Sequence, residues 1–109
     1  MKDVIFIDSS REDLRDFPPE ARREAGYQIG QVQQGFEPSD WKPMTSVGAG
    51  VREIRIHEAG EHRVLYIAKF EEAVYVLHAF RKKTLKTAAQ DIDLAKKRYQ
   101  ALVNARKRR

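Results

Sequence analysis

The stretch from Val51 to Phe80, VREIRIHEAGEHRVLYIAKFEEAVYVLHAF, decides the fold of this 109-residue chain. It contains three runs of β-branched and aromatic residues, which predict strands over 51–57, 62–70 and 73–80. Because only short turns separate these runs, consecutive strands must pair as an antiparallel meander. The third run is the most apolar of the three, which predicts that it lies at the centre of the sheet.

Before this stretch, the N-terminal segment predicts one more strand and a short helix. Val4–Ile7 is an apolar run, which predicts a buried strand that joins an edge of the meander. Ser9 and Glu12 have the spacing of a capping box, which predicts the start of a helix. That helix is expected to end near Phe17, because two prolines follow and the residue before a proline is pushed out of the helical region.

A second helix is expected from Pro19 to about Gln34, with Gly35 as its C-terminal cap. Its apolar residues recur every three or four positions and form one stripe: Ala21, Ala25, Ile29, Val32 and Phe36. The following segment, Phe36–Gly50, is rich in proline and glycine. It is predicted to be a long loop of the functional or mobile kind.

The last element is predicted to be a helix that begins with a capping box of Thr87 and Gln90. Its apolar stripe is Ala88, Ile92, Ala95, Tyr99 and Leu102. The expected order is therefore β-α-α-β-β-β-α, an α+β fold in which two N-terminal helices cover one face of a small, mainly antiparallel sheet. The length of the chain predicts a single domain over residues 1–109.

The composition favours an anionic partner. Lysine and arginine total 21 against 16 aspartate and glutamate residues, for a formal net charge of +5. Such an excess suggests a nucleic acid, a membrane surface or an acidic protein. We favour a nucleic acid because several of the cations lie within predicted strands. We expect no membrane insertion, because the N-terminal apolar run is far too short to span a bilayer.

The chain has no cysteine, which excludes a disulfide framework, a thiolate metal site and a cysteine nucleophile. Together with the absence of a signal-peptide pattern, this predicts a cytoplasmic protein. The histidines, His57, His62 and His78, do not have metal-ligand spacing, and no carboxylate cluster accompanies them. The sequence therefore predicts neither a metal site nor a cofactor.

Basic residues are placed on or next to the predicted strands. Arg55 and Arg63 alternate with apolar residues, whereas Arg81, Lys82 and Lys83 follow the third strand of the meander. A side chain on a strand is held rigidly, so its guanidinium can be aimed at a phosphate and can stabilise charge that develops there. The competing interpretation is that each of these cations simply faces solvent.

Several of these motifs together resemble the phage-derived branch of the RelE/HigB toxins. The matching segments are VREIRI from Val51, HRVLYI from His62, VLHAFRKKT from Val76 and DIDLAKKR from Asp91. The resemblance covers about residues 3–104, and the combination of spacings is more specific than any one segment. It implies a RelE/ParE-like fold with the element order predicted above.

The resemblance also implies an activity: a metal-independent endonuclease that cleaves messenger RNA, either free or on the ribosome, and leaves 2′,3′-cyclic phosphate ends. Such an mRNA interferase inhibits translation. Arg63, Lys82 and Lys83 match the family's active-site cations. His78 is a candidate base, with a buried structural role as the alternative. The residues expected to bind RNA are Arg55, Arg81, Lys42, Trp41 and Tyr66.

One departure concerns the aromatic or histidine residue that some relatives carry shortly after the basic pair. Leu85, Ala88 and Ala89 occupy that region here, so this role has no occupant. A second departure is that Ala88 follows Thr87 where the branch often has a proline. Trp41 and Tyr66 are the nearest aromatic candidates for base stacking, although both residue types are more often found in cores.

Two alternatives remain open from the sequence. A ParE-like toxin would have the same fold but would poison DNA gyrase through protein contact, because a fold does not determine a function. A non-catalytic basic module that binds RNA or protein is the other alternative, and the missing aromatic residue favours it. If the chain is a toxin, the resemblance implies a cognate helix-turn-helix antitoxin as its partner.

Overall fold

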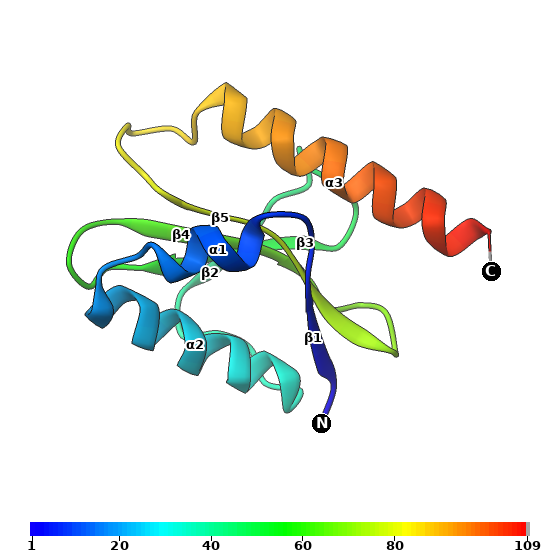
Figure 1. Cartoon of the computed structure of the whole chain (residues 1–109), viewed down its shortest axis with the longest axis horizontal. Coiled ribbons are helices and arrows are strands. Elements are labelled where there is room, and N and C mark those ends of the chain that lie inside the picture. The colour runs from blue at the N-terminus through cyan, green and yellow to red at the C-terminus, as the bar shows by residue number, and fades with distance from the viewer. Residues whose placement is uncertain (109) are drawn as a thin grey trace.

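The computed structural model describes residues 1–108, which form a mixed sheet with helices on both faces (Figure 1). This is an α+β fold, as predicted. Within the described residues the elements are β1 (Asp3–Phe6), α1 (Ser10–Arg15), α2 (Pro19–Gln33), β2 (Trp41–Pro43), β3 (Val51–Ile56), β4 (His62–Ile67), β5 (Ala73–Arg81) and α3 (Ala89–Lys107). None of the helices in residues 1–108 is long and apolar enough to cross a membrane.

The strands lie in the order β1-β5-β4-β3-β2. Strands β3, β4 and β5 form the predicted antiparallel meander, and β1 joins an edge of it by pairing in parallel with β5. The predicted central place of β5 is wrong, since β4 lies in the middle. β5 is apolar because it is an interior strand, with β1 on one side and β4 on the other.

The predicted loop over Phe36–Gly50 contains a strand that the sequence pattern did not indicate. Strand β2 pairs antiparallel with β3 and forms the edge of the sheet opposite β1. It has only three residues, and one of them is Pro43, so it shows neither the length nor the alternation by which strands are recognised.

Both predicted capping boxes are wrong. The Ser9 hydroxyl donates to the Asp13 carboxylate at 3.0 Å and makes no capping bond to the backbone. Helix α3 has Ala88 at its N-cap, while the Thr87 hydroxyl donates to Glu53 at 3.4 Å. In each case a carboxylate competes successfully for the hydroxyl that the local pattern assigned to the helix start.

The end of α2 is capped as predicted. Gly35 has φ +94°, and the amides of Gly35 and Phe36 donate to the carbonyls of Val32 and Gln31, both at 3.0 Å. This pair of bonds is a Schellman motif, which requires the left-handed conformation that glycine adopts without strain. The turn leaves Phe36 60% exposed, so its predicted place in the apolar stripe is wrong.

Two apolar clusters, one on each face, hold the layers together. Helices α1 and α2 pack on one face of the sheet. Helix α1 does so through Leu14, and α2 through the predicted stripe of Ala21, Ala25, Ile29 and Val32. Helix α3 packs on the other face through Ala95 and Leu102, with Ile92 and Tyr99 partly buried, which confirms its predicted stripe. Because successive strand residues point to opposite faces, the register decides which charged side chains lie under α3.

Candidate functional site

The register places two neighbouring rows of side chains on the face that α3 covers. One row, in strand order from β2 to β5, is Lys42, Glu53, Leu65 and His78. The next row, from β3 to β5, is Arg55, Arg63 and Phe80. The two rows bring together Lys42, Arg55, Arg63 and His78, four of the residues that the sequence predicted for the site.

Glu53 lies at the centre of the cations. Its carboxylate is fully buried, and its Oε1 lies 3.7 Å from Arg63 Nε, 3.8 Å from Arg55 Nε and 3.8 Å from Lys42 Nζ. This oxygen accepts no hydrogen bond, although ionic partners surround it. A buried carboxylate of this kind is tolerated because of the adjacent positive charge. Glu53 therefore holds the basic cluster together.

Arg63 is only 5% exposed and is fixed by several partners. Its Nη1 donates to Glu61 Oε1 at 2.9 Å and to the backbone carbonyl of His62 at 2.9 Å, while its Nε faces Glu53. The guanidinium is thus rigidly oriented, as the sequence analysis expected of a strand residue. The carboxylates of Glu53 and Glu61 also neutralise the guanidinium, which the sequence pattern did not predict.

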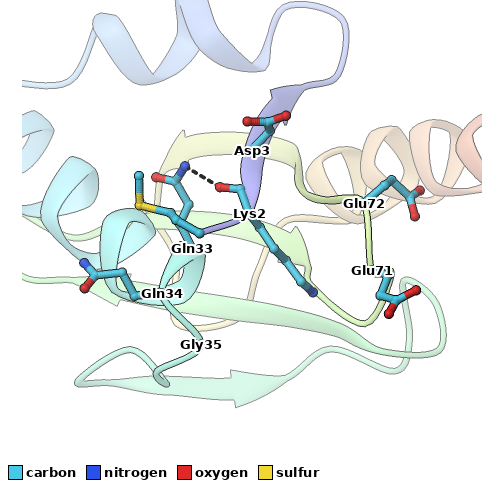
Figure 2. Close-up of a pocket in the computed structure, with 8 residues that line it drawn as sticks. Lys2, Asp3, Gln33, Gln34, Gly35, Glu71 and Glu72 are labelled. Carbon is cyan, nitrogen blue, oxygen red and sulfur yellow. Dashed lines mark hydrogen bonds between the residues drawn. The ribbon is translucent and has the colours of Figure 1, made fainter.

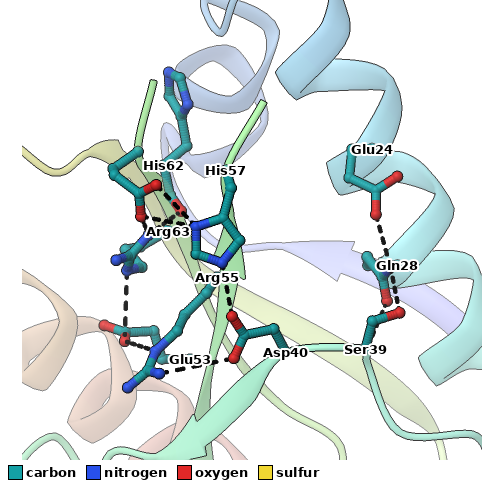
Figure 3. A network of polar contacts seen from close by, with 10 residues as sticks. Glu24, Gln28, Ser39, Asp40, Glu53, Arg55, His57, His62 and Arg63 are labelled. Atoms are coloured by element: carbon teal, nitrogen blue, oxygen red, sulfur yellow. Dashed lines mark hydrogen bonds and ion pairs between the residues drawn. The ribbon is translucent and has the colours of Figure 1, made fainter. Parts of the chain in front are cut away.

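A second set of contacts joins the edge of the sheet to the β3–β4 turn (Figure 3). His57 bonds through Nε2 to Asp40 at 2.7 Å and through Nδ1 to Glu61 at 2.8 Å. Arg55 Nη1 lies 3.7 Å from the same Asp40. Hydrogen bonds to Asp40 and then Glu61 raise the pKa of His57, and hydrogen bonds from His57 and then Arg63 lower the pKa of Glu61.

His78 is buried at the far end of the first row. Its Nε2 lies 2.8 Å from Asp91 Oδ1, at the start of α3, and its ring stacks on Phe80 with centroids 4.9 Å apart. In the neutral imidazole, Asp91 accepts the proton carried by Nε2, which leaves Nδ1 as an acceptor. Nδ1 is buried and has no hydrogen-bond partner. This geometry suits a proton acceptor that a carboxylate orients.

Lys82 and Lys83 begin the connection from β5 to α3. The Lys82 amide donates to the Glu61 carbonyl at 2.8 Å, so the connection starts beside the β3–β4 turn. Both lysines line a pocket of about 440 Å³ together with Phe80, Thr84 and Asp91. Lys82 therefore follows β5 at the same end of the sheet as Arg55 and Arg63.

Three predicted RNA-binding residues lie on the opposite face. Arg81 is in register with His62, whose ring points away from the cluster in Figure 3 and packs on Phe17 at 4.5 Å. Trp41 is in register with Ile54, and Tyr66 belongs to the apolar cluster under α1 and α2. The structure does not bring these three together with Arg63.

Sequence reasoning missed Glu53, Glu61 and Asp91, the carboxylates that contact the predicted cations and His78. Glu53 carried a weak signal, because it shares a strand face with Arg55 while most other residues of that strand are apolar. Asp91 belongs to a motif used for the resemblance, but only the fold shows that it reaches His78. Local periodicity does not predict such contacts between distant segments.

A further pocket lies away from both rows. It has a volume of about 660 Å³ and is bordered by the start of β1, the end of α2 and the turn before β5 (Figure 2). Its single lysine, Lys2, donates to the carbonyls of Ala68 and Phe70 and so is already engaged. Within residues 1–108, no three His, Asp or Glu side chains are grouped to bind a metal ion.

Comparison with known protein families gives a match over most of the chain. The family model described as phage-derived protein Gp49-like (DUF891) matches residues 12–100, which include both arginine strands and the start of α3. No curated protein matches the chain.

Proposed function

This chain belongs to the phage-derived Gp49-like family, a RelE-like toxin family, and from that premise we propose that it is the toxin of a type II toxin–antitoxin pair. We propose further that it is an mRNA interferase, an endoribonuclease that inhibits translation by cutting messenger RNA. The observation that carries this proposal is the rigid placement of Arg63 beside Arg55, on one face and at one end of the sheet. The Lys82 amide bonds to the backbone of Glu61, whose carboxylate contacts Arg63, so the connection that carries Lys82 and Lys83 starts at this end.

The proposed reaction is an attack of the ribose 2′-hydroxyl on the adjacent phosphorus. The bond to the 5′-oxygen breaks, and a 2′,3′-cyclic phosphate forms. Arg63 and Arg55 are proposed to stabilise the charge that develops on the phosphate, because fixed cations stabilise a transition state without reorganising. Lys82 or Lys83 is proposed to supply the proton that the departing oxygen needs.

Two groups near the arginines are candidates for accepting the 2′-hydroxyl proton. His78 has an unpartnered Nδ1 and is oriented by Asp91, whereas Glu53 has an oxygen that accepts no hydrogen bond. A base must come within hydrogen-bond reach of the proton it removes. Glu53 lies 3.7 Å from Arg63 Nε, the group proposed to hold the phosphate, which makes it the better placed of the two.

The site is closed in this structure, and RNA must open it. Glu53 is fully buried and is contacted by Thr87, which lies just before α3, while Asp91 in the first turn of α3 contacts His78. Because Arg63 is paired with carboxylates, an incoming phosphate has to compete with Glu61 for its Nη1. We therefore propose that the segment 82–88 moves when RNA binds.

A second candidate, the ParE-like toxin, is favoured by one specific observation. Arg63 is buried and neutralised by Glu53 and Glu61, which is the state expected of a structural ion pair. In that case the toxin would act by protein contact, and the cluster would only stabilise the sheet.

Growth after induction of the protein alone, with RNA ends mapped in the same cultures, tests the proposal. Wild type is expected to stop growth and to create new cyclic-phosphate ends, and the Arg63→Ala/Lys82→Ala double variant to do neither. Arg23→Ala, an exposed position on α2, is the matched control that should behave as wild type. Growth arrest with intact RNA would favour gyrase poisoning, and no arrest by folded wild type would refute the toxin assignment.

The proposed cleavage is metal-independent, so purified protein is expected to cut RNA equally well with and without EDTA. We also propose a helix-turn-helix antitoxin as the cognate partner. Co-expression with the small open reading frame next to the gene is expected to restore growth and to yield a complex on purification. Failure of every adjacent small protein to do either would count against the toxin–antitoxin assignment.

A further inference from the structure

We propose that the face of the sheet opposite Arg63 carries a second binding site, which takes the phosphate group of a nucleotide. The site is a pocket of about 360 Å³ between the end of α2, the start of β1 and the strands β3 and β4. The residues that carry the argument are Phe36, Glu37, Arg52, Tyr66 and Lys69. The nuclease proposal uses none of them, and the inference goes beyond it.

Tyr66 gives the first indication of a ligand. Its side chain is fully buried and borders the pocket, and its hydroxyl has Arg52 as a polar neighbour but makes no hydrogen bond of normal geometry. Buried hydroxyl groups nearly always have a partner, so an unpaired one calls for an explanation. Burial raises the pKa of Tyr66, which keeps the proton on the phenol. Because Arg52 can only donate, the phenol proton has no acceptor, and an anionic oxygen that enters the pocket beside Arg52 would supply one.

The charges around Tyr66 favour an anion. Arg52 and Lys69 border the pocket, and neither forms an ion pair with a carboxylate among the described residues. The ammonium of Lys2, the third cation, is engaged by backbone carbonyls. The only carboxylate in the lining, Glu37, accepts a hydrogen bond from Trp41 Nε1 at 3.1 Å. A phosphate would thus meet two available cations and one neutral donor.

Aromatic groups next to the cations favour a nucleotide over a simple anion. The Arg52 guanidinium lies 4.1 Å from the centroid of the Trp41 ring, which holds it flat and leaves its edge for hydrogen bonding. Phe36 borders the same pocket and is largely exposed, because the Gly35 turn directs it out of the core. A base can stack on such a ring while its phosphate reaches Arg52.

Trp41 is the only tryptophan of the chain, so its fluorescence reports on this pocket directly. Titration with AMP is expected to change the emission of wild type saturably, with adenosine giving no response. Arg23→Gln, at an exposed position near the start of α2, is the matched control and should bind AMP as wild type does. Because Arg52 touches Trp41, its variants are measured by isothermal titration calorimetry instead.

Tyr66→Phe is expected to weaken AMP binding about tenfold, the ratio that one hydrogen bond to a charged group is worth. Arg52→Gln should abolish binding, and the exposed Lys69→Gln gives a second variant that does not depend on the core. Phe36→Ala should reduce the affinity for AMP to that for inorganic phosphate. The proposal is overturned if wild type shows no saturable binding of AMP, or if Arg52→Gln and Lys69→Gln bind as tightly as wild type. Equal affinity for inorganic phosphate and AMP in wild type would refute the nucleotide part.

Discussion

Replacing Glu53 with glutamine (Glu53→Gln) is expected to lower the free energy of unfolding by about 2–3 kcal/mol. The substitution keeps the shape of the side chain and removes the charge from the centre of the cluster. Lys42 and Arg55 lie about 4 Å away, but their side chains are 40% and 35% exposed, so both can turn to water at little cost. The Arg63 side chain is buried and cannot turn to water.

The expected magnitude follows from Arg63 alone. Removing one partner of a buried ion pair typically costs about 3–5 kcal/mol. Arg63 keeps its contact with Glu61 at 2.9 Å, which places the expected loss below that range. Unfolding in urea, followed by fluorescence, measures it. In the double-mutant cycle with Arg63→Met, the two losses should fall short of additivity by about 1–3 kcal/mol.

Glu58→Gln is the matched control, because Glu58 lies exposed in the turn of the same hairpin and forms none of the ion pairs given above. Its expected effect is within about 0.5 kcal/mol of zero. If Glu53→Gln is equally harmless, or if it is additive with Arg63→Met, then Glu53 does not hold the cluster together, and the argument for a preorganised Arg63 is refuted.

Three further predictions concern other parts of the molecule. Arg98→Met should cost about 2 kcal/mol in urea unfolding, since it removes one buried hydrogen bond to Leu77 in β5 and one partly buried hydrogen bond to Ser9 at the N-cap of α1; an unchanged midpoint would contradict this. His57→Gln should destabilise the protein most between about pH 4.5 and 6.5. The raised pKa of His57 gives stability that is lost as pH rises through the folded-state pKa, and the lowered pKa of Glu61 gives stability that is lost as pH falls through its folded-state pKa. A difference from wild type that does not depend on pH would exclude the bridge between His57 and Glu61. Gly48→Ala should cost about 1–3 kcal/mol, because a Cβ there would lie 2.5 Å from the Tyr99 ring, and thermal melting that matches wild type would show that the ring moves freely.

The layers of the fold could be predicted from the sequence because they depend on periodic patterns. The stripes of α2 and α3 and the turns between β3, β4 and β5 are local, so their physics can be read within a short window. Strand β2 could not be predicted, because three residues carry no period and its pairing with β3 is set by tertiary contacts. The capping boxes failed for the same reason, since Thr87 finds its partner 34 positions away, in Glu53.

The candidate site was predictable only in its cations. Arg55 and Arg63 alternate with apolar residues on adjacent strands, so their shared face follows from the pleat. The carboxylates that neutralise them come partly from a turn and an edge, Glu61 and Asp40, whose positions depend on the register. Trp41 and Tyr66, the predicted candidates for base stacking, lie on the other face beside Arg52 and away from Arg63.

The two edges of the sheet restrict how this protein can associate with other chains. Strand β2 has three residues, and Pro43 offers no N–H to a neighbouring strand. At the other edge, the backbone N–H and C=O of Lys2, just before β1, are both bonded to Gln33 of α2. Both edge strands are therefore short, and each is interrupted or bonded at one point, which makes them poor templates for strand addition. Short edges of this kind favour protein partners that bind through side chains on the faces and helices.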